Sequence, residues 1–198
     1  MSQLRIPLDP KRFAAGLTWK DYLAQMGDTR ARTEENYQKA ALTEEERRFF
    51  AGVGQARYAL MLAENWCGDV HRSSPLLARI VEAMPSCELR VLFRDQNLEL
   101  TDCFLNNGYR SIPILVFFDG DWNEIGRWIE RPHAATQRVV GIRAKTLDVA
   151  PPDKQEPAMI EYRKQIQAVY EAPDNPWRET AKEVRQVLET RLGLAARK

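Results

Sequence analysis

The chain has 198 residues, of which 44% are hydrophobic and 29% charged, the composition of an ordinary globular protein of one domain with additions or at most two. Its formal net charge of +1 carries no signature of nucleic-acid or anionic-membrane binding, and no apolar run approaches the length of a bilayer span. Three scattered cysteines are too few for a disulfide framework and the N-terminal stretch has no apolar secretory segment, so we expect a cytoplasmic protein.

Residues 1–54 are predicted to form an N-terminal helical extension. Thr18 is placed to cap a short amphipathic helix. Thr43 is followed by three glutamates, a capping-box pattern that predicts a helix carrying Phe49 and Phe50 and ending at the glycines of 52–54.

Strands and helices are predicted to alternate over residues 55–131, the core of the fold. The expected strands are 57–63, 88–93, 114–119 and 124–129, and the expected helices are 71–84 and 98–107. The order β-α-β-α-β-β needs helical crossovers between the first strands, which predicts a parallel pair inside a mixed sheet with helices on its faces. The fold class is therefore α/β. Asp95 and Asn97 are expected to cap the helix that begins near residue 98.

Residues 132–198 are predicted to form a C-terminal helical extension that packs on the core. Prolines in the segment 148–157 predict a loop there. The segments 156–172 and 175–193 are expected to pair as antiparallel helices, with Asn175 as the N-cap of the second and Gly193 just past its end.

Cys67 is the residue with the clearest chemical potential, because it lies between a predicted strand and a predicted helix. The N-terminal end of a helix stabilises a thiolate over a thiol, which lowers the pKa and raises the nucleophilicity. Gly68 leaves the sulfur approachable. Asp69 opposes the thiolate, whereas His71 would favour it if protonated. The alternative is that Cys67 is a small buried hydrophobic residue, the usual role of a free cysteine.

Two prolines add weight to the chemical interpretation. Pro113 stands just before an apolar strand, a position that predicts a cis Ile112–Pro113 bond presenting backbone groups beside the cysteine. Pro75 interrupts an otherwise regular helical stripe and predicts a tolerated kink.

Several separated motifs together resemble the thioredoxin family in their order and spacing: WCGD (66–69), the kinking Pro75, RDQN (94–97), GYRSIP (108–113) and the hairpin FFDGDWNEIGRW (117–128). The resemblance covers about residues 55–131 and implies a thioredoxin-like fold. The extensions are similar to those of a bacterial subgroup whose motif reads W-C-G-D-C.

By this resemblance Cys67 matches the attacking cysteine, Trp66 its flanking aromatic residue and Pro113 the cis-proline. The sequence departs from the family twice. Val70 stands where the family has its resolving cysteine, and Met61 stands where it has a buried acid that assists the second thiol. The two losses are consistent with each other, because that acid has no task without the second thiol.

The first interpretation is a monothiol redox protein, in which Cys67 forms a mixed disulfide with a protein or with glutathione and an outside thiol resolves it. No resident cofactor is expected, and glutathione is a candidate co-substrate. Cys103 is the internal candidate for a resolving thiol, provided its Cα lies within about 7 Å of that of Cys67. Cys87 is expected at the opposite end of the sheet.

The second interpretation is a redox-inactive binding module that uses the groove beside Pro113. Its exposed aromatic contacts would be Trp66, Tyr109, Trp122 and Trp128, although the last two are more commonly hairpin and core residues. A third, metal or cluster binding through Cys67 and an external ligand, is ranked last. His71 and His133 have no paired spacing, so no metal site is expected.

Overall fold

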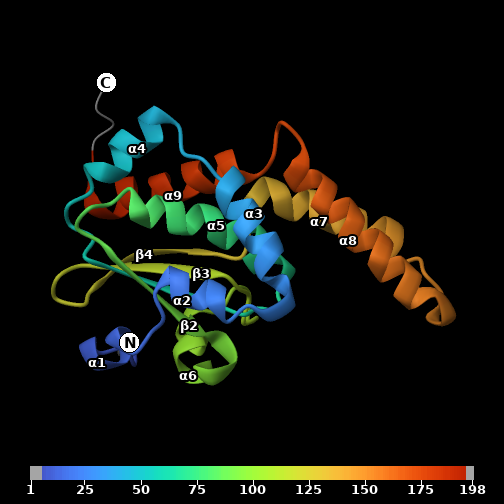
Figure 1. Ribbon diagram of the computed structural model, residues 1–198, viewed down its shortest axis with the longest axis horizontal. Helices are drawn as coiled ribbons and strands as arrows, with labels where there is room; N and C mark the ends of the chain where they lie inside the picture. The colour runs from blue at the N-terminus through green and yellow to red at the C-terminus, as the bar shows by residue number, and fades with distance from the viewer. Residues whose placement is uncertain (1–5, 195–198) are drawn as a thin grey trace. The chain divides into compact units, whose positions relative to one another are not determined.

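The computed structural model describes residues 6–194 (Figure 1). Its elements in chain order are helices α1 (Pro10–Ala14), α2 (Trp19–Ala24), α3 (Arg30–Lys39) and α4 (Glu44–Ala51), strand β1 (Tyr58–Ala63), helix α5 (Gly68–Glu82), strand β2 (Glu88–Phe93), helix α6 (Leu98–Thr101), strands β3 (Ile114–Phe118) and β4 (Glu124–Ile129), and helices α7 (His133–Thr146), α8 (Gln155–Glu171) and α9 (Trp177–Leu192). Single 3-10 turns occupy Gly27–Thr29, Arg94–Gln96, Asp102–Phe104 and Pro152–Lys154.

The chain divides into two compact units. One contains the described residues up to Glu130 together with those from Ala181 onward, and the other is Arg131–Thr180. Helices α1 to α4 therefore belong to the same unit as the sheet. The division into the regions 1–54, 55–131 and 132–198 as domains stays a prediction.

The sheet has the strand order β2-β1-β3-β4. Strands β1 and β2 pair in parallel, whereas β3 is antiparallel to both of its neighbours. This arrangement confirms the predicted α/β class, with one parallel pair inside a mixed sheet. The outer edge of β2 is covered at one point, where Leu17 and Val91 exchange two backbone hydrogen bonds of 2.8 Å.

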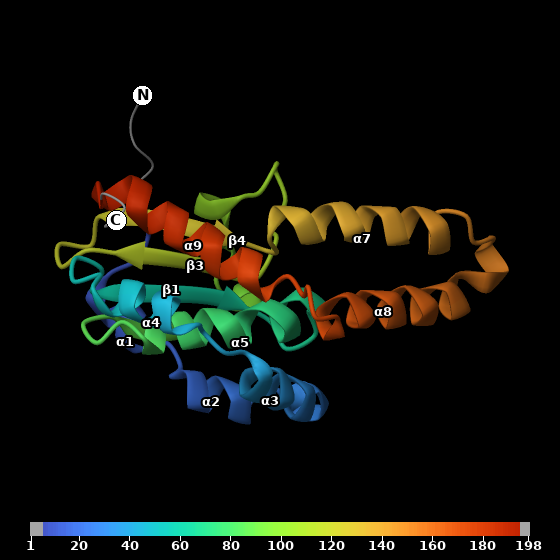
Figure 2. The same ribbon diagram turned by 90° about the horizontal axis from the view of Figure 1, so that it is seen from above.

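Helices lie on both faces of the sheet. Helix α5 and the part of α9 from Ala181 onward cover one face, and α6 lies on the other (Figures 1 and 2). Because both faces are covered, β1 and β3 are almost wholly buried and carry continuous apolar runs.

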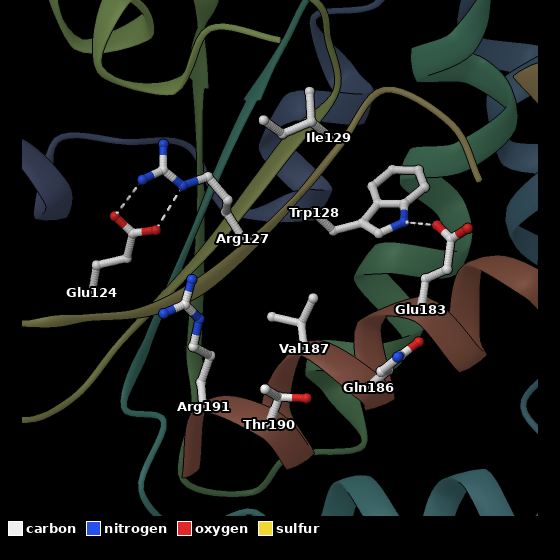
Figure 3. A pocket seen from close by; sticks show the side chains of 9 residues that line it. All are labelled: Glu124, Arg127, Trp128, Ile129, Glu183, Gln186, Val187, Thr190 and Arg191. Atoms are coloured by element: carbon white, nitrogen blue, oxygen red, sulfur yellow. Dashed lines mark hydrogen bonds and ion pairs between the residues drawn. The ribbon is translucent and has the colours of Figure 1, made fainter. Parts of the chain in front are cut away.

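Helix α9 packs closely against β4 (Figure 3). Gly126 makes this approach possible, since a Cβ atom at that position would lie 2.6 Å from Cγ1 of Val187. Nearby, the indole Nε1 of Trp128 donates a 2.8 Å hydrogen bond to the carboxylate of Glu183. One face of β4, the last strand, is thus covered by a helix from much later in the chain.

The predicted helix caps at the N-terminal end are confirmed. The Thr18 side chain accepts a hydrogen bond from the Asp21 N–H at the start of α2. Thr43 and Glu46 form the complete capping box of α4, whose C-cap is Gly52. The predicted cap of the helix near residue 98 is wrong, because the Asn97 side chain makes no capping bond and α6 has only one turn.

Within the unit Arg131–Thr180, α7 and α8 pack side by side (Figure 2). The partner of α8 in this unit is therefore α7, which the sequence did not predict, and the expected pairing of α8 with the last helix stays a prediction. Helix α8 also begins earlier than its prolines suggested, at Gln155. Pro157 lies in its first turn, where a missing N–H has no intrahelical partner to lose. The predicted N-cap of α9 is confirmed by a 3.0 Å bond from the Trp177 N–H to Oδ1 of Asn175.

Candidate functional site around Cys67

Cys67 immediately precedes helix α5 and serves as its N-cap, at the carboxyl-terminal edge of β1. Its backbone is extended, with φ −85° and ψ 121°, and its carbonyl oxygen accepts the His71 N–H at 3.3 Å. The side chain is half-buried. The positive end of the helix dipole lies at this point, which is an environment that stabilises a thiolate.

The sulfur of Cys67 faces the backbone before β3. Its Sγ atom lies 3.7 Å from the carbonyl oxygen of Ile112, to which the thiol donates. The Ile112–Pro113 peptide bond is cis, as the sequence predicted, and both residues are buried. The Pro113 carbonyl accepts the Glu130 N–H at 2.7 Å. The structure therefore brings together Cys67, Ile112 and Pro113.

Trp66 is the exposed aromatic residue beside the thiol, with 57% of its surface accessible. Its indole Nε1 donates to the Asp95 carboxylate at 3.3 Å, and the guanidinium of Arg94 stacks over its ring at 4.9 Å. Arg94 also donates to the Arg110 carbonyl at 3.0 Å. The predicted capping role of Asp95 is thus replaced by a role in holding Trp66.

Gly68 accommodates a buried cation next to the cysteine. Arg72 is only 8% exposed, and its Nη1 atom lies 2.8 Å from the place where a Cβ on Gly68 would stand. A positive charge close to a cysteine favours the thiolate. Sequence analysis did not single out Arg72, although its spacing of four residues from Gly68 on a helix is a usable signal.

Val70, which stands where the resemblance places a second thiol, is fully buried in the first turn of α5. Its carbonyl accepts a 2.5 Å hydrogen bond from the Ser74 hydroxyl. Asp69, also in the first turn, is half-buried. Pro75 lies inside α5, as predicted, and the kink expected at this position stays a prediction.

His71 does not supply the positive charge that was considered for it. The side chain is 5% exposed, and its Nδ1 lies 3.0 Å from the Thr33 hydroxyl. Burial first, and then the charges of Arg72 and Arg32, lower the pKa of His71 to about 4. The imidazole is therefore neutral at neutral pH, and its contribution is structural.

Glu64 is a buried acid that sequence analysis missed. It is 6% exposed, and its Oε1 accepts the Asp95 N–H at 2.7 Å. Burial is the main cause of the raised pKa of Glu64. Met61, where the resemblance places a buried acid, is an apolar core residue of β1. A charged residue directly after an apolar strand was the available signal for Glu64.

The other two cysteines differ in their surroundings. Cys87 precedes the N-terminal end of β2, whereas Cys67 follows the C-terminal end of β1. Because β1 and β2 are parallel, the two cysteines lie at opposite ends of these strands. Burial raises the pKa of Cys87 to about 12. Cys103 lies in the 3-10 turn after α6, where its Sγ contacts the Glu99 carbonyl at 3.6 Å and burial raises its pKa. All three cysteines are free in the described part of the chain.

A cavity of about 470 Å³ lies between β4 and α9 and contains no cysteine. It is lined by Glu124, Arg127, Trp128, Ile129, Glu183, Gln186, Val187, Thr190 and Arg191 (Figure 3). Over residues 6–194 no three His, Cys, Asp or Glu side chains gather in a way that would hold a metal ion. None of the helices in that range combines the length and the apolar character needed to cross a bilayer.

Comparison with known proteins gives one family match. A family model described as Thioredoxin matches residues 16–150. A protein of unknown function from Pseudomonas aeruginosa, solved at 1.5 Å, is similar in structure with a TM-score of 0.58 at 16% identity, and an HIV epitope-scaffold designated 4E10 has a TM-score of 0.59 at 15% identity. Each alignment covers 90% of this chain and 95% of the other, and at this identity each shows the fold alone. No curated protein matches the chain.

Proposed function

Because this chain belongs to the thioredoxin family, we propose that it carries out thiol–disulfide exchange with Cys67 as its single nucleophile. The observation that carries the proposal is the placement of the Cys67 sulfur, half-buried at the start of α5 and 3.7 Å from the carbonyl before Pro113. The WCGD sequence at 66–69 supports placing the chain in the bacterial subgroup whose motif reads W-C-G-D-C.

The reaction has two exchange steps. The Cys67 thiolate attacks one sulfur of a disulfide, the S–S bond breaks, and the other sulfur leaves as a thiolate that takes up a proton. Cys67 is then joined to the first sulfur in a mixed disulfide. A second thiol from outside the chain attacks that mixed disulfide, forms a new disulfide with the substrate sulfur and releases Cys67. The substrate is a protein disulfide or oxidised glutathione, and glutathione is a suitable outside thiol in a reducing compartment such as the cytoplasm.

An outside thiol is required because nothing in the loop replaces the second cysteine. Val70 is apolar and buried. Cys103 is the internal candidate, but its raised pKa leaves little thiolate at neutral pH to attack a mixed disulfide. We therefore expect Cys103→Ser to release a glutathione adduct from Cys67 at the wild-type rate when excess thiol is added. A Cys67–Cys103 disulfide, detected by mass spectrometry after oxidation, would contradict this assignment.

The experiment that tests the proposal is alkylation of Cys67 by iodoacetamide as a function of pH, followed by peptide mass spectrometry. We expect half-maximal reactivity below about pH 8.5, the value of an unperturbed cysteine, because the helix end and Arg72 favour the thiolate. Cys103 in the same molecule is the internal control and should react more slowly. Slow alkylation of Cys67 with a midpoint at or above that value would contradict the redox proposal. The remaining function would then be a redox-inactive binding module that uses the groove beside Pro113.

A further inference from the structure

Strand β4 lies at the edge of the sheet, so only one side of its backbone has a neighbouring strand. The Glu130 N–H donates to the Pro113 carbonyl at 2.7 Å, in register with the antiparallel ladder between β3 and β4. Hydrogen-bonded pairs alternate along such a ladder, so Trp128, two residues earlier, also directs its N–H and C=O groups toward β3. The N–H and C=O groups of its neighbours Arg127 and Ile129 therefore point outward, away from the sheet.

The outward groups of β4 are unused. Over residues 6–194, nothing donates to or accepts from the outward N–H and C=O groups of Arg127 and Ile129. The opposite edge of the sheet differs, because there Leu17 and Val91 exchange two backbone hydrogen bonds. Four backbone groups of β4 are thus able to pair with a further strand.

The features that usually protect an edge strand do not block this one. Edge strands are commonly protected by proline, bulges or free charges. Strand β4 has no proline, and the bulge of its ladder lies at Phe118, before the regular stretch. The Arg127 guanidinium donates to Glu124 at 2.7 and 3.0 Å and to the Cys103 carbonyl at 2.8 Å, and it lies over the Phe104 ring at 4.9 Å. Its charge is therefore neutralised and held beside the turn after α6.

The cavity between β4 and α9, of about 470 Å³, follows this open edge. Its lining includes Trp128 and also Arg127 and Ile129, which precede and follow it. Side chains of consecutive strand residues point to opposite faces of a sheet. A cavity lined by all three residues therefore runs along the edge of the strand, where an added strand would lie.

Helix α9 forms the wall of this cavity and determines its chemistry. Glu183, Val187 and Arg191 follow one another at a spacing of four residues and point toward β4 (Figure 3). The Glu183 carboxylate accepts the indole N–H of Trp128 at 2.8 Å. Arg191 is exposed and, within the described part of the chain, forms no hydrogen bond or ion pair. Its guanidinium is therefore available to a carboxylate of a bound molecule.

We propose that the open edge of β4 binds an extended peptide segment of another protein, which joins the four-stranded sheet as a fifth strand and places an acidic side chain against Arg191. The backbone groups of Arg127 and Ile129 hold the peptide, and the cation on α9 selects its side chain. The lining of the cavity contains no cysteine, so the inference goes beyond the proposed thiol exchange and does not depend on it.

A second copy of the chain is a poorer occupant of this edge. A two-fold pairing of β4 with itself, centred on Trp128, brings the Glu183 carboxylates of both copies toward each other. A pairing centred on Arg127 sets two guanidinium groups opposite each other. Like charges in such positions are destabilising. A peptide that carries a carboxylate avoids both arrangements.

The first test measures binding by fluorescence anisotropy. The probe is a labelled nine-residue peptide of alternating threonine and valine with a central glutamate, and the comparison peptide has a central glutamine. The full-length protein should bind the glutamate peptide about two- to fivefold more tightly, the effect of one exposed ion pair. Arg191→Gln should abolish this preference, and Arg191→Glu should shift it to a peptide with a central lysine. Lys20→Gln, which removes an exposed cation from α2, is the matched control.

The second test addresses the backbone. Amide hydrogen exchange by NMR should slow about tenfold at Arg127 and Ile129 when the glutamate peptide is present at ten times its Kd. The Trp128 amide, already bonded to β3, is the internal control and should not change. N-methylation of one alternate set of peptide amides should abolish binding, and methylation of the other set should leave it intact, because alternate amides of a strand point to opposite sides.

Three results would overturn the inference. The first is no binding of the glutamate peptide up to about 1 mM. The second is binding that leaves the exchange of the Arg127 and Ile129 amides unchanged. The third is a dimer of the wild-type protein that protects these amides without peptide, since the edge then belongs to a second copy. Cys67→Ser should bind the peptide as the wild type does, so the result is independent of the proposed thiol exchange.

Discussion

The side-chain amide of Asn36 donates a 2.8 Å hydrogen bond to the backbone carbonyl of His71, inside helix α5. In an unbroken helix that carbonyl would accept the N–H of residue 75, but Pro75 has none. Asn36 therefore supplies from α3 the donor that the helix itself lacks. The same bond links the N-terminal helices to the helix that begins at Cys67.

We expect Asn36→Ala to lower the free energy of unfolding by about 1–3 kcal/mol, because it leaves the buried His71 carbonyl without a donor. Urea denaturation followed by circular dichroism measures the change. Adding Pro75→Ala restores an N–H at residue 75, so the double variant should recover part of the loss. Gln38→Ala, exposed on the same helix, is the control. A loss equal to that of the control, or no recovery in the double variant, would contradict the explanation.

The buried His71 should make the fold sensitive to acid. Its folded pKa of about 4 lies below the value of about 6.5 for an unfolded histidine, so the unfolded chain takes up the proton first as the pH falls. Stability is therefore present above pH 6.5 and declines toward pH 4, by roughly 2–3 kcal/mol between pH 7 and pH 4.5. Unfolding free energies at both pH values test this. His71→Gln should flatten the pH dependence of the unfolding free energy, whereas the control His133→Gln should leave it unchanged. If the stability of His71→Gln falls with pH in parallel with that of the wild type, His71 is not the group responsible.

Val70→Cys should raise dithiothreitol-driven insulin reduction several-fold, because it places a thiol one helical turn from Cys67. Valine and cysteine side chains are similar in volume, so the buried site should accommodate the new thiol, and burial shields the new sulfur from unrelated oxidants. Val70→Ala and the double change Val70→Cys with Cys67→Ser are the controls, and both should stay at the wild-type background. If Val70→Cys also stays there, the surroundings of Cys67 do not support dithiol turnover.

Gly126→Ala should destabilise the sheet unit by about 1–3 kcal/mol, because the new methyl group would meet Val187 at 2.6 Å. Thermal unfolding measures the effect. Val187→Ala removes the obstacle, so the double variant should be more stable than the sum of the two single changes predicts. Gly54→Ala, with nothing within 4 Å of its added Cβ, serves as the reference. If the stability losses of Gly126→Ala and Val187→Ala simply add, the contact between the new methyl group and Val187 is not the cause of the destabilisation.

The strands were the most predictable part of the fold. The boundaries of β2 and β4 agree with the sequence to the residue, because each apolar run is bounded by turn residues that fix its ends. The caps at Thr18 and Thr43 were readable for a similar reason, since capping is a local interaction. The packing of α8 against α7 could not be predicted, because an apolar stripe shows that a face is buried and does not identify the partner.

The site was predictable in outline and not in its electrostatics. The cis bond before Pro113 and the helix start at Cys67 follow from local sequence. The neutral state of His71 depends on burial beneath α3, which no local pattern reveals.

The contact between β4 and α9 has a consequence for how the protein is made. Ribosomes synthesise Gly126 and Trp128 well before Glu183 and Val187, with residues 131–180 in between. During that interval the apolar surface of β4 has no cover from its own helix, and nascent chains with exposed strand surfaces are prone to self-association. Chaperone binding to stalled nascent chains should therefore fall sharply once the residues around Val187 have left the exit tunnel.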